Sequence, residues 1–197
     1  MHRERGASLI ELLFAMAILL LICGIAMPDL MAAKRRLTMR ASVSRAAAVL
    51  LTTRGRAVAI GRHTAIRFTA AADGWTYSVF EDGNANGVTA ADIKSGVDRL
   101  VEGPDRFERH TGIAVVGFPP FTIDDPDTGR PINPASKAIA FGSSSMCSFG
   151  PDDTSTPGTI YVTDGVTAAA IRCSPDGEVH TMWYEPTTHI WWRSRGE

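Results

Sequence analysis

The chain has 197 residues, of which 45% are hydrophobic, and its 20 Lys and Arg residues nearly balance its 21 Asp and Glu residues. This length fits one globular domain together with one long additional element. The balanced charge gives no sign of a protein that binds nucleic acid or acidic partners through its overall charge.

The first element is an apolar segment that follows a short basic leader. The leader, residues 1–6, contains two arginines and ends in Gly6, and residues 12–27 then carry no charged side chain. Together with Leu9 and Ile10, about 20 residues are apolar, which is enough for one helix to cross a bilayer core. The arginines predict a cytoplasmic N-terminus, with the chain beyond Pro28 on the outer side of the membrane.

One carboxylate, Glu11, interrupts the apolar segment. A charge within a membrane helix costs at least ~2.5 kcal/mol and therefore normally has a partner or a task. The junction Gly6–Ala7 precedes the apolar segment, whereas the cleavage site of a secretory signal follows it. Cleavage at this junction would leave the helix on the mature protein.

At these residues the sequence resembles the type IV pilin and pseudopilin superfamily, with Gly6 before the cut and Glu11 as the fifth residue of the mature chain. The resemblance implies that a prepilin peptidase cleaves between Gly6 and Ala7, and that the new amino group of Ala7 is methylated. Family members usually have Phe where this chain has Ala7. In a filament, Glu11 would meet the amino terminus of a neighbouring subunit, so that each charge compensates the other. The alternative is a plain signal anchor with a chance glutamate.

The helix is expected to continue past Pro28, with a bend there, and to end near Ile60. Its second half should pack an apolar stripe against the sheet that follows, through Leu30, Leu37, Val43, Val49, Leu50, Ala57 and Ile60. Five basic residues are expected to face solvent or lipid headgroups where the helix leaves the membrane, namely Lys34, Arg35, Arg36, Arg40 and Arg45.

From residue 63 the hydrophobic period changes from helical to two, which predicts an antiparallel β domain. The predicted strands are residues 63–68, 75–80, 113–118, 137–141, 159–163, 168–173 and 178–184, with the first two joined by a turn at 72–74. The fold class is therefore α+β, pilin-like, with a long N-terminal helix packed on an antiparallel sheet. The predicted parts are the leader 1–6, the transmembrane and assembly half of the helix 7–28, its amphipathic half 29–61, and a periplasmic β-rich domain 62–197.

Within the superfamily, the sequence resembles the GspH/FimT type of minor pilin. The resemblance rests on the Arg- and Ala-rich helix end 54–62, Trp75 in the second strand, and a closing hairpin from residues 158–162 and 170–179. Glu178 stands where family members usually have a basic residue. The resemblance implies a single-pass inner-membrane subunit whose partners are other minor and major pilins, and secreted cargo or DNA.

The cysteines fall in two different environments. Cys23 lies in the predicted membrane span, where it is expected only to pack. Cys147 and Cys173 lie in the exported domain, where an oxidising compartment favours a disulfide closing a loop of about 27 residues. Two buried free thiols are the alternative. The spacing predicts neither a zinc site nor redox catalysis.

An acidic loop begins like a calcium-binding loop. Asp82, Asn84 and Asn86 supply oxygen atoms at alternate positions, and Gly87 stands at the sixth. The position of the bidentate glutamate is Ile93, and Asp92 comes one residue early. Because Gly- and Asn-rich turns are common for backbone reasons alone, a connecting loop is the preferred interpretation and no cofactor is expected.

The C-terminal segment 182–197 combines three tryptophans with Arg193 and Arg195. Aromatic side chains beside arginines can bind single-stranded nucleic acid without reading its sequence. Some FimT-like relatives bind incoming DNA through arginines near the C-terminus. The preferred interpretation is a last strand whose tryptophans cap the core or contact a neighbouring pilin.

Signs of an enzyme are weak. Residues 142–146 miss the nucleophile-elbow pattern because Met146 replaces its last glycine, and the five histidines show no metal-binding spacing. The sequence therefore predicts a structural subunit of a type IV pilus or type II secretion pseudopilus near the filament tip. The alternative function is DNA capture for natural transformation.

Overall fold

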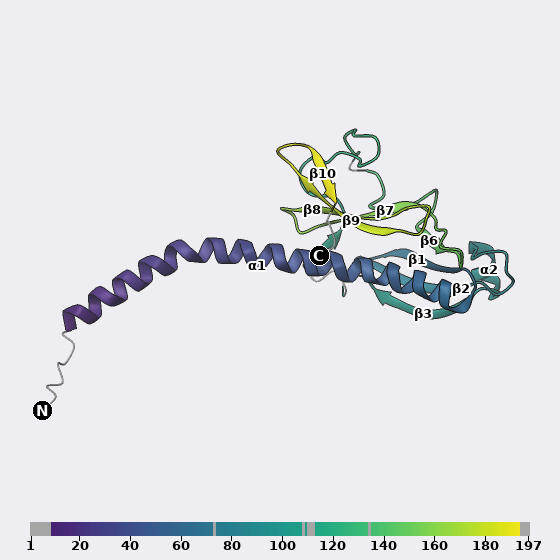
Figure 1. The fold of residues 1–197 in the computed structure, drawn as a ribbon, viewed down its shortest axis with the longest axis horizontal. Helices are drawn as coiled ribbons and strands as arrows, with labels where there is room; N and C mark the ends of the chain where they lie inside the picture. The colour runs from purple at the N-terminus through teal and green to yellow at the C-terminus, as the bar shows by residue number, and fades with distance from the viewer. Residues whose placement is uncertain (1–8, 73, 108, 110–112, 134, 194–197) are drawn as a thin grey trace, which may run out of the picture. The chain divides into compact units, whose positions relative to one another are not determined.

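The computed structural model describes residues 9–72, 74–107, 109, 113–133 and 135–193 (Figure 1). The chain divides into two compact units, Met1–Thr38 and Met39–Glu197. Helix α1, Leu9–Ile60, runs through the boundary, so each unit contains one part of it. Its end at Ile60 and its continuation through Pro28 confirm the predicted helix.

In the second unit, one face of α1 is buried. The buried positions recur every three or four residues and are Met39, Ser42, Val43, Ala46, Ala47, Leu50, Thr53 and Ala57. Such spacing places side chains on one face of a helix. Leu30, Leu37 and Ile60 were expected in this stripe but are exposed, because the buried face of α1 extends only from Met39 to Ala57.

Two antiparallel sheets form the rest of this unit (Figure 1). The first sheet has the order β3-β2-β1-β6, and the second has the order β10-β9-β8-β7-β4, with β5 pairing to β7. The strands are β1 Thr64–Ala71, β2 Gly74–Glu81, β3 Arg99–Arg106, β4 Val115–Val116, β5 Ile139–Phe141, β6 Met146–Phe149, β7 Gly158–Thr163, β8 Ala168–Cys173, β9 Val179–Glu185 and β10 Ile190–Arg193. A short helix, α2 Ala90–Ser95, lies between β2 and β3.

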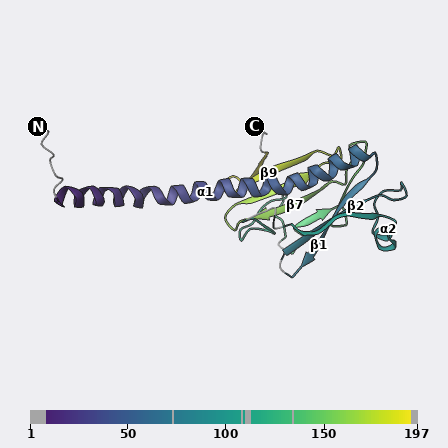
Figure 2. The same cartoon turned by 90° about the horizontal axis from the view of Figure 1, so that it is seen from below.

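The main core lies between the helix and the inner faces of the sheets. In Figure 2 the second-unit part of α1 runs along the strands. Leu50 and Val43 from α1 belong to the same buried cluster as Phe107, Ile160 and Ile171. Burying such side chains contributes about 1.5–3 kcal/mol each and holds the unit together.

The second sheet is covered on both faces. Alternate residues of β7 and β8 point away from the main core, and Tyr161 and Ala170 form a smaller cluster with Ile123 and Tyr184. Phe118, Phe121 and Ile132, from the loop between β4 and β5, pack against that cluster. Burial on both faces explains the continuous apolar run of Ala168–Ile171, which otherwise lacks the expected alternation.

Candidate functional site

The first unit presents an exposed apolar helix. Every residue from Leu9 to Leu37 is exposed. By its length and composition, α1 could cross a membrane. Burying this surface in a bilayer or against other apolar helices would remove a large apolar area from water, and each such side chain would contribute about 1.5–3 kcal/mol.

Glu11 lies in the first turn of α1 and is exposed. A carboxylate there interacts favourably with the positive end of the helix dipole. Its position near the start of α1 leaves the apolar stretch that follows uninterrupted by charge up to Pro28. The predicted processing residues Gly6 and Ala7 lie outside the described residues.

The predicted basic cluster is exposed, as expected: Lys34, Arg35, Arg36, Arg40 and Arg45 all face outward. It directly follows the apolar part of α1. This order suits a helix that leaves a membrane with anionic headgroups, since basic residues near such a surface gain about 1 kcal/mol each.

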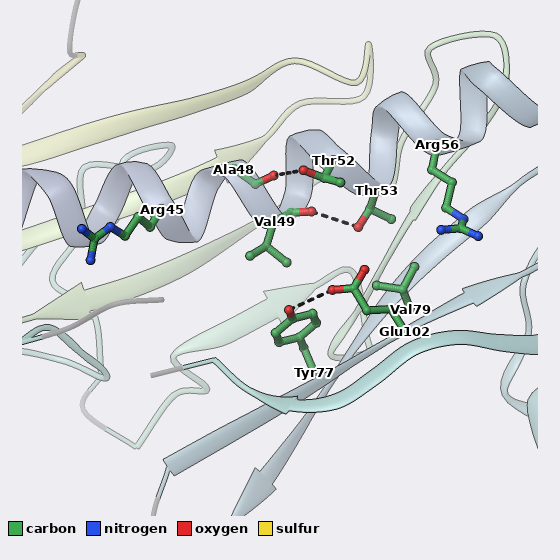
Figure 3. A pocket seen from close by; sticks show the side chains of 9 residues that line it. All are labelled: Arg45, Ala48, Val49, Thr52, Thr53, Arg56, Tyr77, Val79 and Glu102. Atoms are coloured by element: carbon green, nitrogen blue, oxygen red, sulfur yellow. Dashed lines mark hydrogen bonds between the residues drawn. The ribbon is translucent and has the colours of Figure 1, made fainter. Parts of the chain in front are cut away.

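A groove runs beside α1 in the second unit and has a volume of about 330 Å³ (Figure 3). Arg45, Val49 and Arg56 line it from α1, while Tyr77 and Glu102 line it from the first sheet. The Tyr77 hydroxyl donates to Glu102 Oε1 at 3.0 Å. Burial and this hydrogen bond raise the pKa of Tyr77 to about 12. At neutral pH the hydroxyl is therefore protonated and acts as a donor, so it offers no base for catalysis.

An ion-pair cluster ties the end of α1 to the first sheet, and sequence reasoning missed it. Glu81 accepts from Arg56 Nε at 2.6 Å and from Arg99 Nη2 at 2.7 Å. The hydrogen bond from Arg99 lowers the pKa of Glu81, and Arg56 adds to this effect against the cost of burial. No local motif indicates a cluster whose members lie in α1, β2 and β3.

The acidic loop is organised by hydrogen bonds within the chain. The Asp82 carboxylate accepts from the backbone N–H groups of Ala85 at 2.8 Å and Gly87 at 2.8 Å, and also from that of Asn84. Burial would raise the pKa of Asp82, but these hydrogen bonds outweigh it and lower the pKa. Within the described residues, no three His, Cys, Asp or Glu side chains gather in a metal-binding group.

Asp92 has a capping role next to this loop. Its carboxylate accepts from the side chains of Thr89 at 2.9 Å and Asn86 at 3.1 Å, while its backbone N–H donates to the Thr89 hydroxyl at the start of α2. These hydrogen bonds lower the pKa of Asp92. The contacts account for the Asp- and Asn-rich sequence as a loop and helix cap.

The C-terminal tryptophans belong to a hairpin of β9 and β10. Trp183 is buried in the main core, and Trp192 stacks on it with ring centroids 6.2 Å apart. Trp191 packs on the opposite face against Tyr184, and its Nε1 donates to the Asp124 carbonyl at 2.6 Å. This confirms the preferred interpretation of a last strand that caps the core.

Of the two predicted DNA-binding arginines, Arg193 lies within the described residues. Arg193 forms an ion pair with Glu178, the residue that departs from the family pattern. Its charge is therefore partly compensated, which weakens attraction for phosphate. Arg195 lies outside the described residues.

A polar cluster fixes the tip of the same hairpin. Asp124 Oδ2 accepts from the Tyr184 hydroxyl at 3.1 Å and lies 3.0 Å from His189 Nδ1. Burial and the hydrogen bond to Asp124 raise the pKa of Tyr184. Asp124 and His189 are 65 positions apart, so no spacing in the sequence could have indicated the cluster.

Cys147 and Cys173 are both buried and are free thiols in this structure. Cys147 lies in β6 of the first sheet, and Cys173 ends β8 of the second. Cys147 Sγ lies 3.6 Å from the Thr156 carbonyl oxygen and Cys173 Sγ lies 3.1 Å from the Ser155 hydroxyl, so the two sulfur atoms contact consecutive residues of one segment. Cys23 is exposed on the apolar part of α1.

Residues 1–27 match the family described as the Prokaryotic N-terminal methylation motif. This motif is the prepilin-type signal of type IV pilins and pseudopilins, and it includes Gly6, Ala7 and Glu11. The chain thus carries the N-terminal signal of type IV pilins and pseudopilins, and the resemblance noted in its N-terminal sequence is confirmed. No curated protein and no solved structure matches the chain.

Proposed function

We propose that this protein is a minor pilin or pseudopilin, assembled near the tip of a type IV pilus or a type II secretion pseudopilus. The observation that carries the proposal is the prepilin-type signal at residues 1–27, continued by a helix whose residues are exposed from Leu9 to Leu37. The protein would then be a structural subunit and not an enzyme. The GspH/FimT subtype is supported by the pairing of β8 with β7 and β9, which includes the predicted closing hairpin, and by the Arg- and Ala-rich end of α1.

The mechanism of assembly follows from the first unit. A prepilin peptidase would cleave between Gly6 and Ala7 and leave a positively charged amino group there. The apolar helix would hold the mature subunit in the inner membrane as a single span, with its N-terminus cytoplasmic and the β unit periplasmic. Extraction into a filament would exchange lipid contacts for contacts with helices of other pilins.

Glu11 would direct this exchange. In an apolar environment a lone carboxylate and a lone amino group are each costly, so bringing the two together offsets both penalties. A new subunit would therefore seat at the height where its Glu11 meets the Ala7 amino group of a neighbour. This pairing would fix the axial position of each helix relative to its neighbours, because the apolar segments alone do not favour one position.

The test is to produce the full chain with its prepilin peptidase and partner pilins, as wild type, Glu11→Ala and Asp29→Ala. Asp29 is the matched control, because it is also an acidic residue of α1 but lies beyond Pro28. We expect all three chains to lose the six-residue leader by mass spectrometry, while only Glu11→Ala is missing from sheared filaments. Normal incorporation of Glu11→Ala would rule out the pairing mechanism, and an uncleaved wild-type chain would rule out the proposed function.

DNA capture through Arg193 and Arg195 remains the alternative function, and binding of single-stranded DNA over a salt series separates the two. If DNA capture is the function, affinity falls steeply with salt and falls further in Arg193→Ala. We expect no such binding, because Glu178 compensates Arg193. The variant Glu178→Gln removes that compensation and shows how strongly the ion pair reduces the affinity for single-stranded DNA.

A further inference from the structure

We propose that Cys147 and Cys173 form a disulfide that joins the two sheets of the β unit, and that it forms before the unit closes. The inference rests on the proposed function only in placing this unit outside the cytoplasm, where thiols are oxidised. The structure contributes three observations: the two sulfur atoms contact consecutive residues of one segment, the two cysteines belong to different sheets, and both are buried.

The contacts of both sulfur atoms with one short segment support their proximity. Each sulfur contacts one of two consecutive residues, Ser155 and Thr156. Cys147 Sγ lies 3.6 Å from the Thr156 carbonyl oxygen, and Cys173 Sγ lies 3.1 Å from the Ser155 hydroxyl. The segment holding these two residues is itself fixed, since Ser155 N donates to the Pro175 carbonyl and Thr156 N to the Ser148 carbonyl, each at 2.9 Å.

The positions of the two cysteines determine which parts of the β unit the disulfide would connect. Cys147 pairs with Ile66 across β6 and β1, next to the end of α1, whereas Cys173 faces Val179 across β8 and β9. The bond would therefore connect the sheet that follows directly from α1 to the sheet that carries the C-terminal hairpin. In an assembled filament, a pull on the hairpin would be passed to α1 through a covalent link as well as through core packing.

Burial determines when the bond forms. Cys147 is 0% exposed and Cys173 is 1% exposed, so a protein oxidant cannot reach either sulfur in the closed unit. The bond therefore forms while the unit is still open and both sulfur atoms are accessible to the oxidant.

The step is a thiol–disulfide exchange with a protein disulfide oxidant. One of the two cysteine thiolates attacks the disulfide of the oxidant, forms a mixed disulfide and releases one thiolate of the oxidant. The other cysteine thiolate then attacks the sulfur of the first cysteine and releases the second thiolate of the oxidant. The substrate loses two electrons and two protons, and the oxidant becomes a dithiol.

The test uses the full chain, purified in detergent from cells that export it, and counts free thiols after denaturation with and without reductant. Cys23 serves as an internal reference thiol, because it lies in the membrane-spanning part of α1. We expect one free thiol without reductant and three with it, and a peptide joined through Cys147 and Cys173 in the mass spectrum. Three free thiols without reductant, or a bond that includes Cys23, would overturn the inference for the exported protein.

A second arm separates this inference from the proposed function. The full chain is reduced, denatured and refolded in a glutathione redox buffer, where export plays no part. If the disulfide forms in the refolded protein but the protein purified from cells has free thiols, the pairing of Cys147 with Cys173 is supported and export is contradicted. Failure to form the bond in this arm overturns the pairing itself. The control Cys147→Ser/Cys173→Ser should unfold at the same temperature with and without reductant, whereas the refolded wild type should unfold at a lower temperature after reduction.

Discussion

At the scale of single residues, carboxylates within the described chain serve mainly to hold backbone and arginine groups. Asp82 has the largest consequence, because its side chain is buried and accepts three backbone N–H groups. Replacing Asp82 by Ala removes the acceptor of these three hydrogen bonds, and a hydrogen bond typically contributes about 0.5–1.5 kcal/mol to stability. We expect Asp82→Ala to lower the free energy of unfolding by about 2–3 kcal/mol, measured by urea denaturation.

The control for this prediction is Asp152→Ala, because Asp152 is exposed and bonds only to Thr154. It should change stability by less than about 0.5 kcal/mol. Adding a chelator to the wild type also tests the calcium alternative. An unchanged melting temperature supports the connecting loop, whereas a clear fall would show that a bound cation holds Asp82 and its neighbours.

Glu81 predicts how stability depends on pH. The hydrogen bonds from Arg99 and Arg56 lower its pKa in the folded state. A group with a lowered pKa binds fewer protons when folded, so it stabilises the fold above its unfolded pKa of about 4.3. That contribution is lost as the pH falls through the lower, folded pKa. Urea denaturation at a series of pH values below 5 should show the loss in the wild type.

The variant Glu81→Gln cannot titrate, so its stability should be lower at neutral pH and should fall less steeply in acid. Glu185→Gln is the control, since Glu185 is exposed at the end of β9 and its carboxylate accepts hydrogen bonds from Thr187. An acid profile of Glu81→Gln that matches the wild type would contradict the role assigned to the Arg56–Glu81–Arg99 cluster.

At the scale of elements, the long helix depends on small side chains where it meets the core. Ala46 is fully buried between Val43 and Leu50 on the packed face of α1. Replacing it by Leu forces extra atoms into a filled space, which typically costs about 1–3 kcal/mol. We expect Ala46→Leu to lower stability by this amount, measured by thermal or urea unfolding. Ala59→Leu, on the exposed face of the same helix, should have almost no effect.

The elements also show what the sequence could predict. The pair β1–β2 and the strands β7, β8 and β9 were predicted close to their observed bounds, because their apolar residues recur in short runs between turn residues. The predicted strand 113–118 is paired only at Val115–Val116. β3 was missed because its residues are charged and mostly exposed, and β6 and α2 because they are short.

The residues of the candidate site also differ in whether the sequence alone could predict them. The prepilin-type signal is contiguous, so its residues were readable from the sequence alone, and the match at residues 1–27 confirms it. The contact of Asp124 with His189 joins segments 65 positions apart, and that of Glu178 with Arg193 depends on the pairing of β9 with β10. The second sheet could not be predicted either, since hydrophobic alternation identifies strands but does not assign them to sheets.

At the scale of the whole molecule, the two units differ in what stabilises them. All eight buried positions of α1 lie from Met39 onward, while residues Leu9–Leu37 are exposed. The second unit should therefore not need the first to fold. We expect a fragment of residues 35–197 to be soluble without detergent and monomeric, with the urea midpoint that the full chain shows in detergent.

A shorter fragment sharpens this prediction. Residues 45–197 lack Met39 and Val43, two side chains that are 1% exposed in the main core. Removing buried side chains of this size costs about 2–5 kcal/mol for a Met and somewhat less for a Val, so this fragment should unfold at much lower urea. If both fragments are equally stable, the helix contributes little to the core and acts as a tether. If the longer fragment aggregates, the apolar first unit is needed for folding, and the independence of the second unit is wrong.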